Sequence, residues 1–134
     1  MRKLAAVVLL SICIISCGKQ RDVVPYVRVN RIIQKSDIRF SEGTGVIFEN
    51  GIGVAGIIVY RRPDGNYVAY DQCSSYQPEK LCKVVLDNTG LQVEDPCSGS
   101  KFLLFDGSVV KGPAERMLRQ YTVVETQYEI QITN

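Results

Sequence analysis

The feature that most constrains the fold is a run of closely spaced turn residues between Asp95 and Tyr121. The run reads Asp95-Pro96-Cys97-Ser98-Gly99-Ser100-Lys101-Phe102 at its start, Gly112-Pro113-Ala114 in its middle and Leu118-Arg119-Gln120-Tyr121 at its end. Just before it, the turn signal at residues 87–90 separates two short segments, 83–86 and 91–94, that we expect to be strands. Short strands with turns at such frequent intervals predict an all-β domain.

This run resembles the second cluster-binding loop of Rieske iron–sulfur domains. That loop has the pattern Cys-Pro-(Cys or Trp)-His-Gly-Ser-x-Phe, followed by Gly-Pro-Ala and then by Leu-x-x-Tyr. Residues 99–102 match Gly-Ser-x-Phe, which places Asp95 at a ligand cysteine and Ser98 at a ligand histidine. A Rieske centre takes two cysteine and two histidine ligands, and this sequence contains no histidine. The resemblance therefore implies the fold, an antiparallel β-sandwich or small barrel with two apposed loops, but not the cluster.

The first loop of the family corresponds to the segment that starts at Cys73 and ends at Cys82. In many members this loop reads Cys-x-His-x-x-Cys, whereas here it is longer and has Ser75 at the histidine position. Cys73 is then the one ligand position of the four that is retained. The family also joins the last cysteine of this loop to the third residue of the second loop, which implies a Cys82–Cys97 disulfide. The resemblance covers residues 52 to 125, most of one domain.

Two other hypotheses use the same side chains. Three thiolates, those of Cys73, Cys82 and Cys97, could hold zinc or iron together with the carboxylate of Asp95. An exported chain lies in an oxidising compartment, where cysteines pair by default, so we favour the disulfide and predict no metal. In the second hypothesis Cys73 is a reactive thiol, which its exposure and acidity would decide.

The sequence contains no group of side chains that predicts catalysis. Ser98 and Ser100 cannot belong to a Ser-His-carboxylate arrangement, because the chain has no histidine to act as the base. Asp106 and Glu115 are interpreted as solvated turn residues rather than an acid/base pair. We therefore predict a non-catalytic binding or structural module without a cofactor. The alternative is an electron-transfer protein that holds a 2Fe-2S cluster through unconventional Cys/Asp ligation.

The N-terminus has the pattern of a bacterial lipoprotein. A charged start precedes an apolar run at residues 4–15, typical of a secretory signal. Ile14-Ile15-Ser16-Cys17 then resembles a lipobox, whose cysteine thiolate takes up the lipid. The alternative, an uncleaved membrane helix, is disfavoured because the run is shorter than the roughly 20 residues that span a bilayer.

These features divide the chain into a signal peptide (residues 1–16), a lipidated tether (17–25) and a Rieske-like β domain (26–134). We expect the protein in the bacterial cell envelope, anchored to a membrane by acyl chains such as palmitate on Cys17, with an envelope protein as its partner. Arg2 and Lys3 account for the net charge of +2, so the mature chain is nearly neutral. It lacks the basic face that binding to nucleic acid requires.

The remaining strands are read from local patterns. We expect strands at residues 26–33, 45–49, 55–62 and 67–71, with strict alternation at 128–132, and assign no element to 34–40. Asn50-Gly51 predicts a hairpin, as do the turn residues 63–66. The segment Gly51-Ile52-Gly53-Val54-Ala55-Gly56 has the spacing of a dinucleotide-binding fingerprint. A β-branched run follows it instead of a helix, so we interpret these glycines as hairpin residues.

Overall fold

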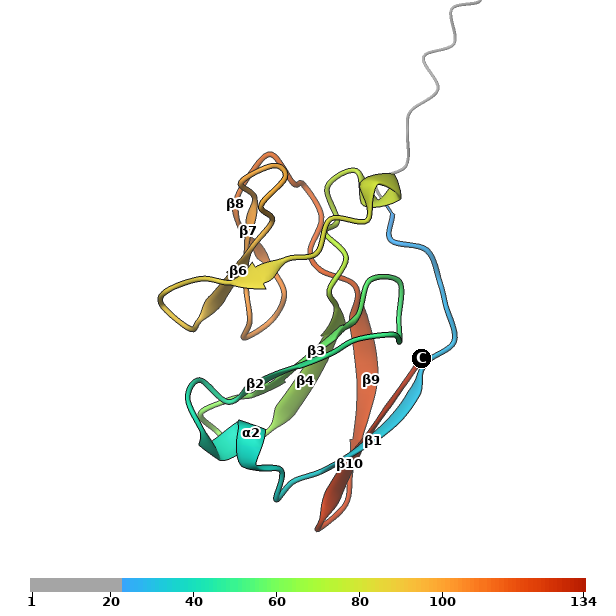
Figure 1. Ribbon diagram of the computed structural model, residues 1–134, viewed down its shortest axis with the longest axis vertical. Helices are drawn as coiled ribbons and strands as arrows, with labels where there is room; N and C mark the ends of the chain where they lie inside the picture. The colour runs from blue at the N-terminus through green and yellow to red at the C-terminus, as the bar shows by residue number, and fades with distance from the viewer. Residues whose placement is uncertain (1–22) are drawn as a thin grey trace, which may run out of the picture.

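The computed structural model describes residues 23–134, which form two antiparallel sheets (Figure 1). The larger sheet has the strand order β1-β10-β9-β4-β3-β2 and the smaller one the order β5-β6-β7-β8. The elements are β1 (Asn30–Gln34), α2 (Ile38–Ser41), β2 (Val46–Glu49), β3 (Ile57–Arg61), β4 (Tyr67–Asp71), η1 (Pro78–Lys80), β5 (Val85–Leu86), β6 (Gln92–Glu94), β7 (Lys101–Leu103), β8 (Val109–Lys111), β9 (Gln120–Glu125) and β10 (Glu129–Thr133). The prediction of an all-β sandwich is confirmed.

Strands β3 and β4 lie between two hydrophobic cores. Ile57 and Val59 face the core enclosed by the larger sheet, where the alternating Ile130 and Ile132 of β10 are also buried. Ile58 faces the other way, into the core shared with the smaller sheet. Because both faces of β3 are covered, residues 57–60 are all apolar and buried, instead of alternating between apolar and polar.

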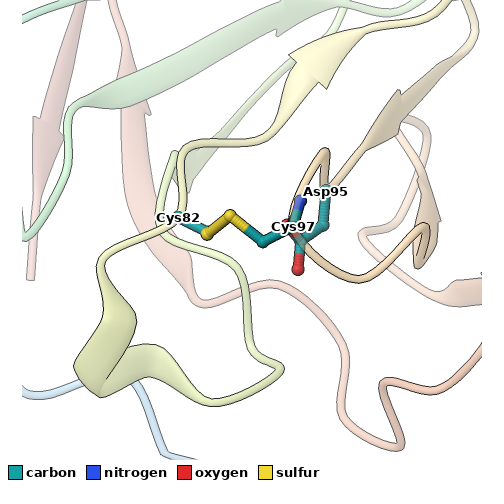
Figure 2. Close-up of side chains that lie close together, drawn as sticks. All are labelled: Cys82, Asp95 and Cys97. Carbon is teal, nitrogen blue, oxygen red and sulfur yellow. Dashed lines mark hydrogen bonds between the residues drawn. A yellow bond between two sulfur atoms is a disulfide. The ribbon is translucent and has the colours of Figure 1, made fainter.

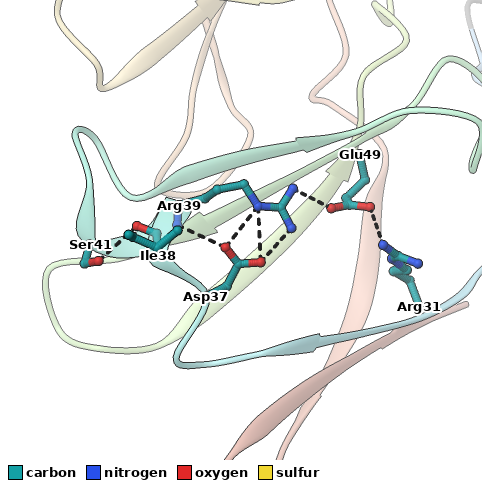
Figure 3. Close-up of polar contacts among 6 residues, drawn as sticks. All are labelled: Arg31, Asp37, Ile38, Arg39, Ser41 and Glu49. Carbon is teal, nitrogen blue, oxygen red and sulfur yellow. Dashed lines mark hydrogen bonds and ion pairs between the residues drawn. The ribbon is translucent and has the colours of Figure 1, made fainter.

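The edge strands β1 and β2 are connected by side chains instead of backbone pairing. The strand order of the larger sheet places them at opposite edges. Arg31 of β1 and Arg39 of α2 both donate to Glu49 at the end of β2, at 2.7 and 2.8 Å (Figure 3). Arg39 also pairs with Asp37, the residue that caps α2, at 2.6 Å. This chain of ion pairs holds α2 and the two edges of the sheet together on the surface.

The first strand begins later than the sequence indicates. A strand was expected at residues 26–33, but β1 spans Asn30–Gln34. Its partner β10 ends at Thr133, so residues 27–29 have no strand to pair with. The side chain of Asn134 bonds their backbone instead. It accepts a hydrogen bond from the Val29 amide and donates one to the Val27 carbonyl. Residues 26–29 are therefore not a strand.

The chain is already packed against the domain at Val24. Val24 is 4% exposed and lies against Ala55 and Cys73, and its carbonyl accepts a hydrogen bond from Arg119. The sequence placed this residue in the tether, whereas the structure makes it part of the fold. The signal segment and Cys17 lie outside the described residues.

Both predicted hairpins are present. β3 pairs with β4 across the turn at residues 63–66, as expected. β2 pairs with β3 as well, but the connection is longer than a two-residue Asn-Gly turn, because Glu49 is opposite Ile57. The glycine-rich residues 50–56 form this loop, and no helix follows it. The geometry that a dinucleotide would need is therefore absent from this part of the described chain.

Candidate functional site

The two loops that the sequence singled out lie together at the end of the smaller sheet. The first connects β4 to β5 and contains η1, and the second connects β6 to β7. Cys82 and Cys97 form a disulfide between them, with their Cα atoms 6.3 Å apart (Figure 2). This is the pairing that the resemblance implies. Cross-linking residues 15 apart in sequence is worth about 3 kcal/mol of stability in the chain-entropy model.

The carboxylate of Asp95 is the centre of a buried hydrogen-bond network. Asp95 is fully buried, and its Oδ2 accepts from the hydroxyls of Ser74 and Ser98, both at 2.7 Å. Its Oδ1 accepts from the backbone N–H of Cys97 at 2.8 Å. Buried carboxylates are tolerated when donors replace the lost water, and this one has three. This chain therefore has, at the position of a ligand cysteine, a carboxylate that is hydrogen-bonded to residues of both loops.

The two serines at the histidine positions point to different partners. Ser98 donates to Asp95 and lies 2.9 Å from the Oγ of Ser100, which accepts a hydrogen bond from the Ala114 amide. Ser100 thus bonds the backbone of the segment that follows β8. Ser75, by contrast, donates to the carbonyl of Arg116. The positions that should face a common iron atom are engaged in separate hydrogen bonds.

Cys73 is the free cysteine of the described residues, and it is completely buried. Burial, and after it the negative charges of Asp71, Asp95 and Glu79, raise the pKa of its thiol to about 11. The thiol is therefore neutral at pH 7 and donates weakly to carbonyls of the first loop. A reactive cysteine needs an accessible thiolate. The hypothesis that Cys73 is a reactive thiol is disfavoured on both counts.

Asp71 is a second buried carboxylate, and the sequence analysis missed its role. It accepts hydrogen bonds from the amides of Val54, Ala55 and Cys73 and from the Tyr121 hydroxyl, the last at 2.6 Å. Burial, and then this hydrogen bond to Asp71, raise the pKa of Tyr121. The β2–β3 loop therefore wraps around a carboxylate of the chain itself. The sequence feature that points to this contact is the glycine-rich loop at residues 50–56, since glycines allow a close approach of the backbone to another group. The sequence does not show that this group is Asp71.

A small cavity opens beside Ser75. Its volume is about 200 Å³, and its walls are Val23, Val24, Ser75 and residues 116–119. Apolar and polar groups both contribute to the lining. Asp106 and Glu115 lie elsewhere on the surface, and Asp106 accepts from the amide and hydroxyl of Ser108, as a turn residue does.

Comparison with solved structures identifies the architecture. The cyanobacterial plasma membrane Rieske protein PetC3 from Synechocystis superposes with a TM-score of 0.60 at 22% identity, covering 81% of this chain and all of that one. The ferredoxin of carbazole 1,9a-dioxygenase from Nocardioides aromaticivorans gives 0.52 at 19% identity, covering 80% of this chain and 97% of that one. The fold is Rieske-like. No protein-family model matches the sequence, and no curated protein matches it either.

The Rieske-like fold implies a [2Fe-2S] cluster, and the residues present do not fit one of the Rieske type. Two imidazoles are required, and the chain has no histidine. Of the two thiolate positions, one is Asp95 and the other is the neutral thiol of Cys73. The alternative metal site, with three cysteines and Asp95 as ligands, is not assembled as a whole. The ligand atoms of Cys82, Asp95 and Cys97 lie within 4.8 Å of one another, but Cys73 is not in that group. Within residues 23–134, no helix is long and apolar enough to span a membrane.

Proposed function

We propose that this chain is a lipid-anchored protein of the bacterial cell envelope whose Rieske-like domain has lost its cluster and serves as a non-catalytic binding or structural module. The observation that carries the proposal is the Asp95 network. Hydroxyls of Ser74 and Ser98 and an amide already use the carboxylate oxygens that would have to turn toward iron. Ligation by Asp95 would leave these buried donors without partners, at roughly 1–3 kcal/mol each.

The network gives the two loops a connection that needs no cluster. A [2Fe-2S] centre ties two loops together by four bonds, and here two other links run between the loops. The disulfide joins Cys82 to Cys97, and the hydrogen bond from Ser74 joins the first loop to Asp95 in the second. The end of the domain is thus a rigid surface, the type of scaffold that can present a binding site.

Envelope location rests on the lipobox at Cys17 and on the place where the fold begins. Val24 packs against Cys73 in the first loop, so the tether leaves the domain beside the two loops. In Figure 1 the start of the described chain lies next to the coil of η1. A membrane or envelope protein near the anchor would meet this end first. That a superposable structure is a plasma membrane Rieske protein agrees with this location.

The cluster claim is tested by purifying the full-length protein without oxygen, with PetC3 handled in parallel as a positive control. We expect a colourless protein with no stoichiometric iron or acid-labile sulfide. Reduction should give no Rieske-type electron paramagnetic resonance signal, because imidazole ligands are lacking. Two irons and two sulfides per chain would overturn the binding-module proposal in favour of an electron-transfer protein with Cys/Asp ligation.

The anchor is tested separately by labelling cells with a fatty acid. Cys17→Ser should leave an unprocessed precursor that takes up no label, because the thiol that receives the lipid is gone. Cys13→Ser, four residues upstream in the same apolar segment, should be labelled and processed as in the wild type. Equal labelling of the Cys17 variant and the wild type would remove the lipid anchor from the proposal.

A further inference from the structure

Three potential metal ligands converge where the two loops meet. The sulfurs of Cys82 and Cys97 and a carboxylate oxygen of Asp95 all lie within 4.8 Å of one another. Figure 2 shows that the disulfide and the Asp95 side chain come from two facing loops. The two sulfurs are bonded to each other, which is what keeps them from acting as ligands. In the Rieske pattern Asp95 stands at a cluster-ligand position, whereas the two disulfide cysteines do not ligate iron, so these three residues are not the family's ligand set.

The ligand set suits zinc. Zinc takes cysteine thiolates at about 2.3 Å and carboxylate oxygens at about 2.0–2.2 Å in tetrahedral sites, so two bound sulfurs lie about 3.8 Å apart. The Cα atoms of Cys82 and Cys97 are 6.3 Å apart, which permits that separation by side-chain rotation once the disulfide is open. A metal between Cys82 and Cys97 does not require the Asp95 carboxylate to turn, since one of its oxygens already lies within 4.8 Å of both sulfurs. Ser74, Ser98 and the Cys97 amide occupy three of its roughly four acceptor positions, so the carboxylate can bind the metal while keeping these hydrogen bonds. Metal-ligating carboxylates usually have such partners in protein sites.

The charge around Asp95 also favours a cation. Asp95 is completely buried, and the ion pairs of residues 23–134 include none to it. The negative charges of Asp71 and Asp95 both raise the pKa of the nearby Cys73 thiol. Cys97, in contrast, is exposed, so a reductant can reach the disulfide. A buried carboxylate and an accessible disulfide are thus adjacent.

We propose that reduction of the Cys82–Cys97 disulfide opens a zinc site formed by Cys82, Asp95 and Cys97. The reductant is a protein dithiol or a small thiol. Its two sulfurs are oxidised to a disulfide, and two electrons and two protons pass to Cys82 and Cys97. Binding of Zn²⁺ then releases both protons as the thiolates form. Three protein ligands leave a fourth position for water or a group from a partner. The proposal concerns the reduced state and leaves the proposed function of the disulfide-bonded protein unchanged.

The test uses full-length protein in detergent, reduced with a phosphine and titrated with Co²⁺ as a spectroscopic substitute for Zn²⁺. The reduced protein should bind one Co²⁺ per chain with thiolate-to-metal absorption, and Zn²⁺ should abolish that absorption. The disulfide-bonded protein should show none. Cys97→Ser should lose the absorption, and Asp95→Asn should weaken binding by at least tenfold. Cys73→Ser, which removes the cysteine outside the group, should bind as the wild type does.

Near-ultraviolet circular dichroism, recorded with and without metal, covers the case in which reduction or a substitution unfolds the domain. A reduced protein that unfolds alone and refolds with one equivalent of Zn²⁺ would support the site, because metal binding then contributes folding free energy. A reduced protein that takes up no metal, folded or unfolded, would overturn it. So would equal binding by the oxidised protein, or loss of the absorption in Cys73→Ser.

Discussion

At the scale of single residues, two buried carboxylates organise this domain. Asp71 and Asp95 are both completely buried, and each accepts at least three hydrogen bonds from backbone amides or hydroxyls. Neither forms an ion pair among the described residues. Removing one of them would leave several buried donors without an acceptor. Each such donor costs about 1–3 kcal/mol, more than the roughly 0.5–1.5 kcal/mol that a hydrogen bond contributes to stability. Both positions therefore tolerate little change.

Gly53 shows how closely the backbone approaches Asp71. It has a φ of +75°, and a Cβ at this position would lie 2.7 Å from Asp71 Oδ2. Gly53→Ala should therefore lower the free energy of unfolding by about 1–2 kcal/mol for the left-handed backbone, plus the cost of displacing the carboxylate. Urea denaturation measures this change.

Gly65→Ala is the matched control for that substitution. Gly65 also has a positive φ, +89°, but an added Cβ would meet nothing within 4 Å. This variant should show the backbone cost alone. Equal losses in the two variants would mean that the contact with Asp71 contributes nothing to the requirement for glycine at position 53.

At the scale of elements, α2 and the two edge strands depend on the charges around Arg39. Hydrogen bonds from the Arg39 side chain, and then from its backbone N–H, lower the pKa of Asp37 from 3.8 to about 2. A carboxyl whose folded pKa is lowered stabilises the protein above its unfolded pKa and loses this effect as the pH falls. The relevant window thus runs from about pH 4 down to about pH 2.

Asp37→Asn tests this window while keeping a side chain that caps helices well. The variant should be less stable than the wild type at pH 6, and the difference should disappear as the pH falls to about 2. It should also shrink in 1 M salt, because the pair is on the surface. Urea midpoints across this pH range measure the effect. A difference that persists at pH 2 would assign it to packing instead of charge.

The elements that the sequence predicted best are those with a strong local signal. The hairpins, the alternation of Ile130 and Ile132 and the disulfide pair all follow from turn residues, periodicity or the loop pattern. The start of β1 could not be predicted, because it depends on where β10 ends, and β10 is about 100 residues away in sequence. The burial of Asp71 could not be predicted either, since its partners come from three separate segments. At the site, the sequence located Asp95 and Ser98 but not the hydrogen bonds that connect them.

At the scale of the whole molecule, the N-terminal segment covers the loop end. Val24 fills a small apolar cluster with Ala55 and Cys73, although it is far from both in sequence. This segment and the first loop also share the cavity beside Ser75. The accessibility of Cys73 therefore depends on Val24, a residue far from it in sequence.

Val24→Gly should expose Cys73 to alkylation in the native protein. In the wild type the thiol is buried and its pKa is about 11, so reaction with iodoacetamide should be slow at pH 8 and should accelerate as the pH rises. Removing the Val24 side chain opens the cover and should increase the rate several-fold. Val23→Gly is the control, because Val23 is already 46% exposed. Mass spectrometry of the native protein follows the modification, and equal rates in the two variants would contradict a covering role.

The packing of Val24 against the first loop also limits where the domain can search for a partner. Val24 is seven positions after Cys17, a reach of about 25 Å at full extension. With Cys17 lipid-modified as proposed, the loop end is confined to a thin layer above the membrane. Encounters with partners in the same membrane are then two-dimensional and occur at a high local concentration, so a weak contact is sufficient for a large bound fraction. A partner whose binding surface lies deeper in the envelope than this layer would be out of reach.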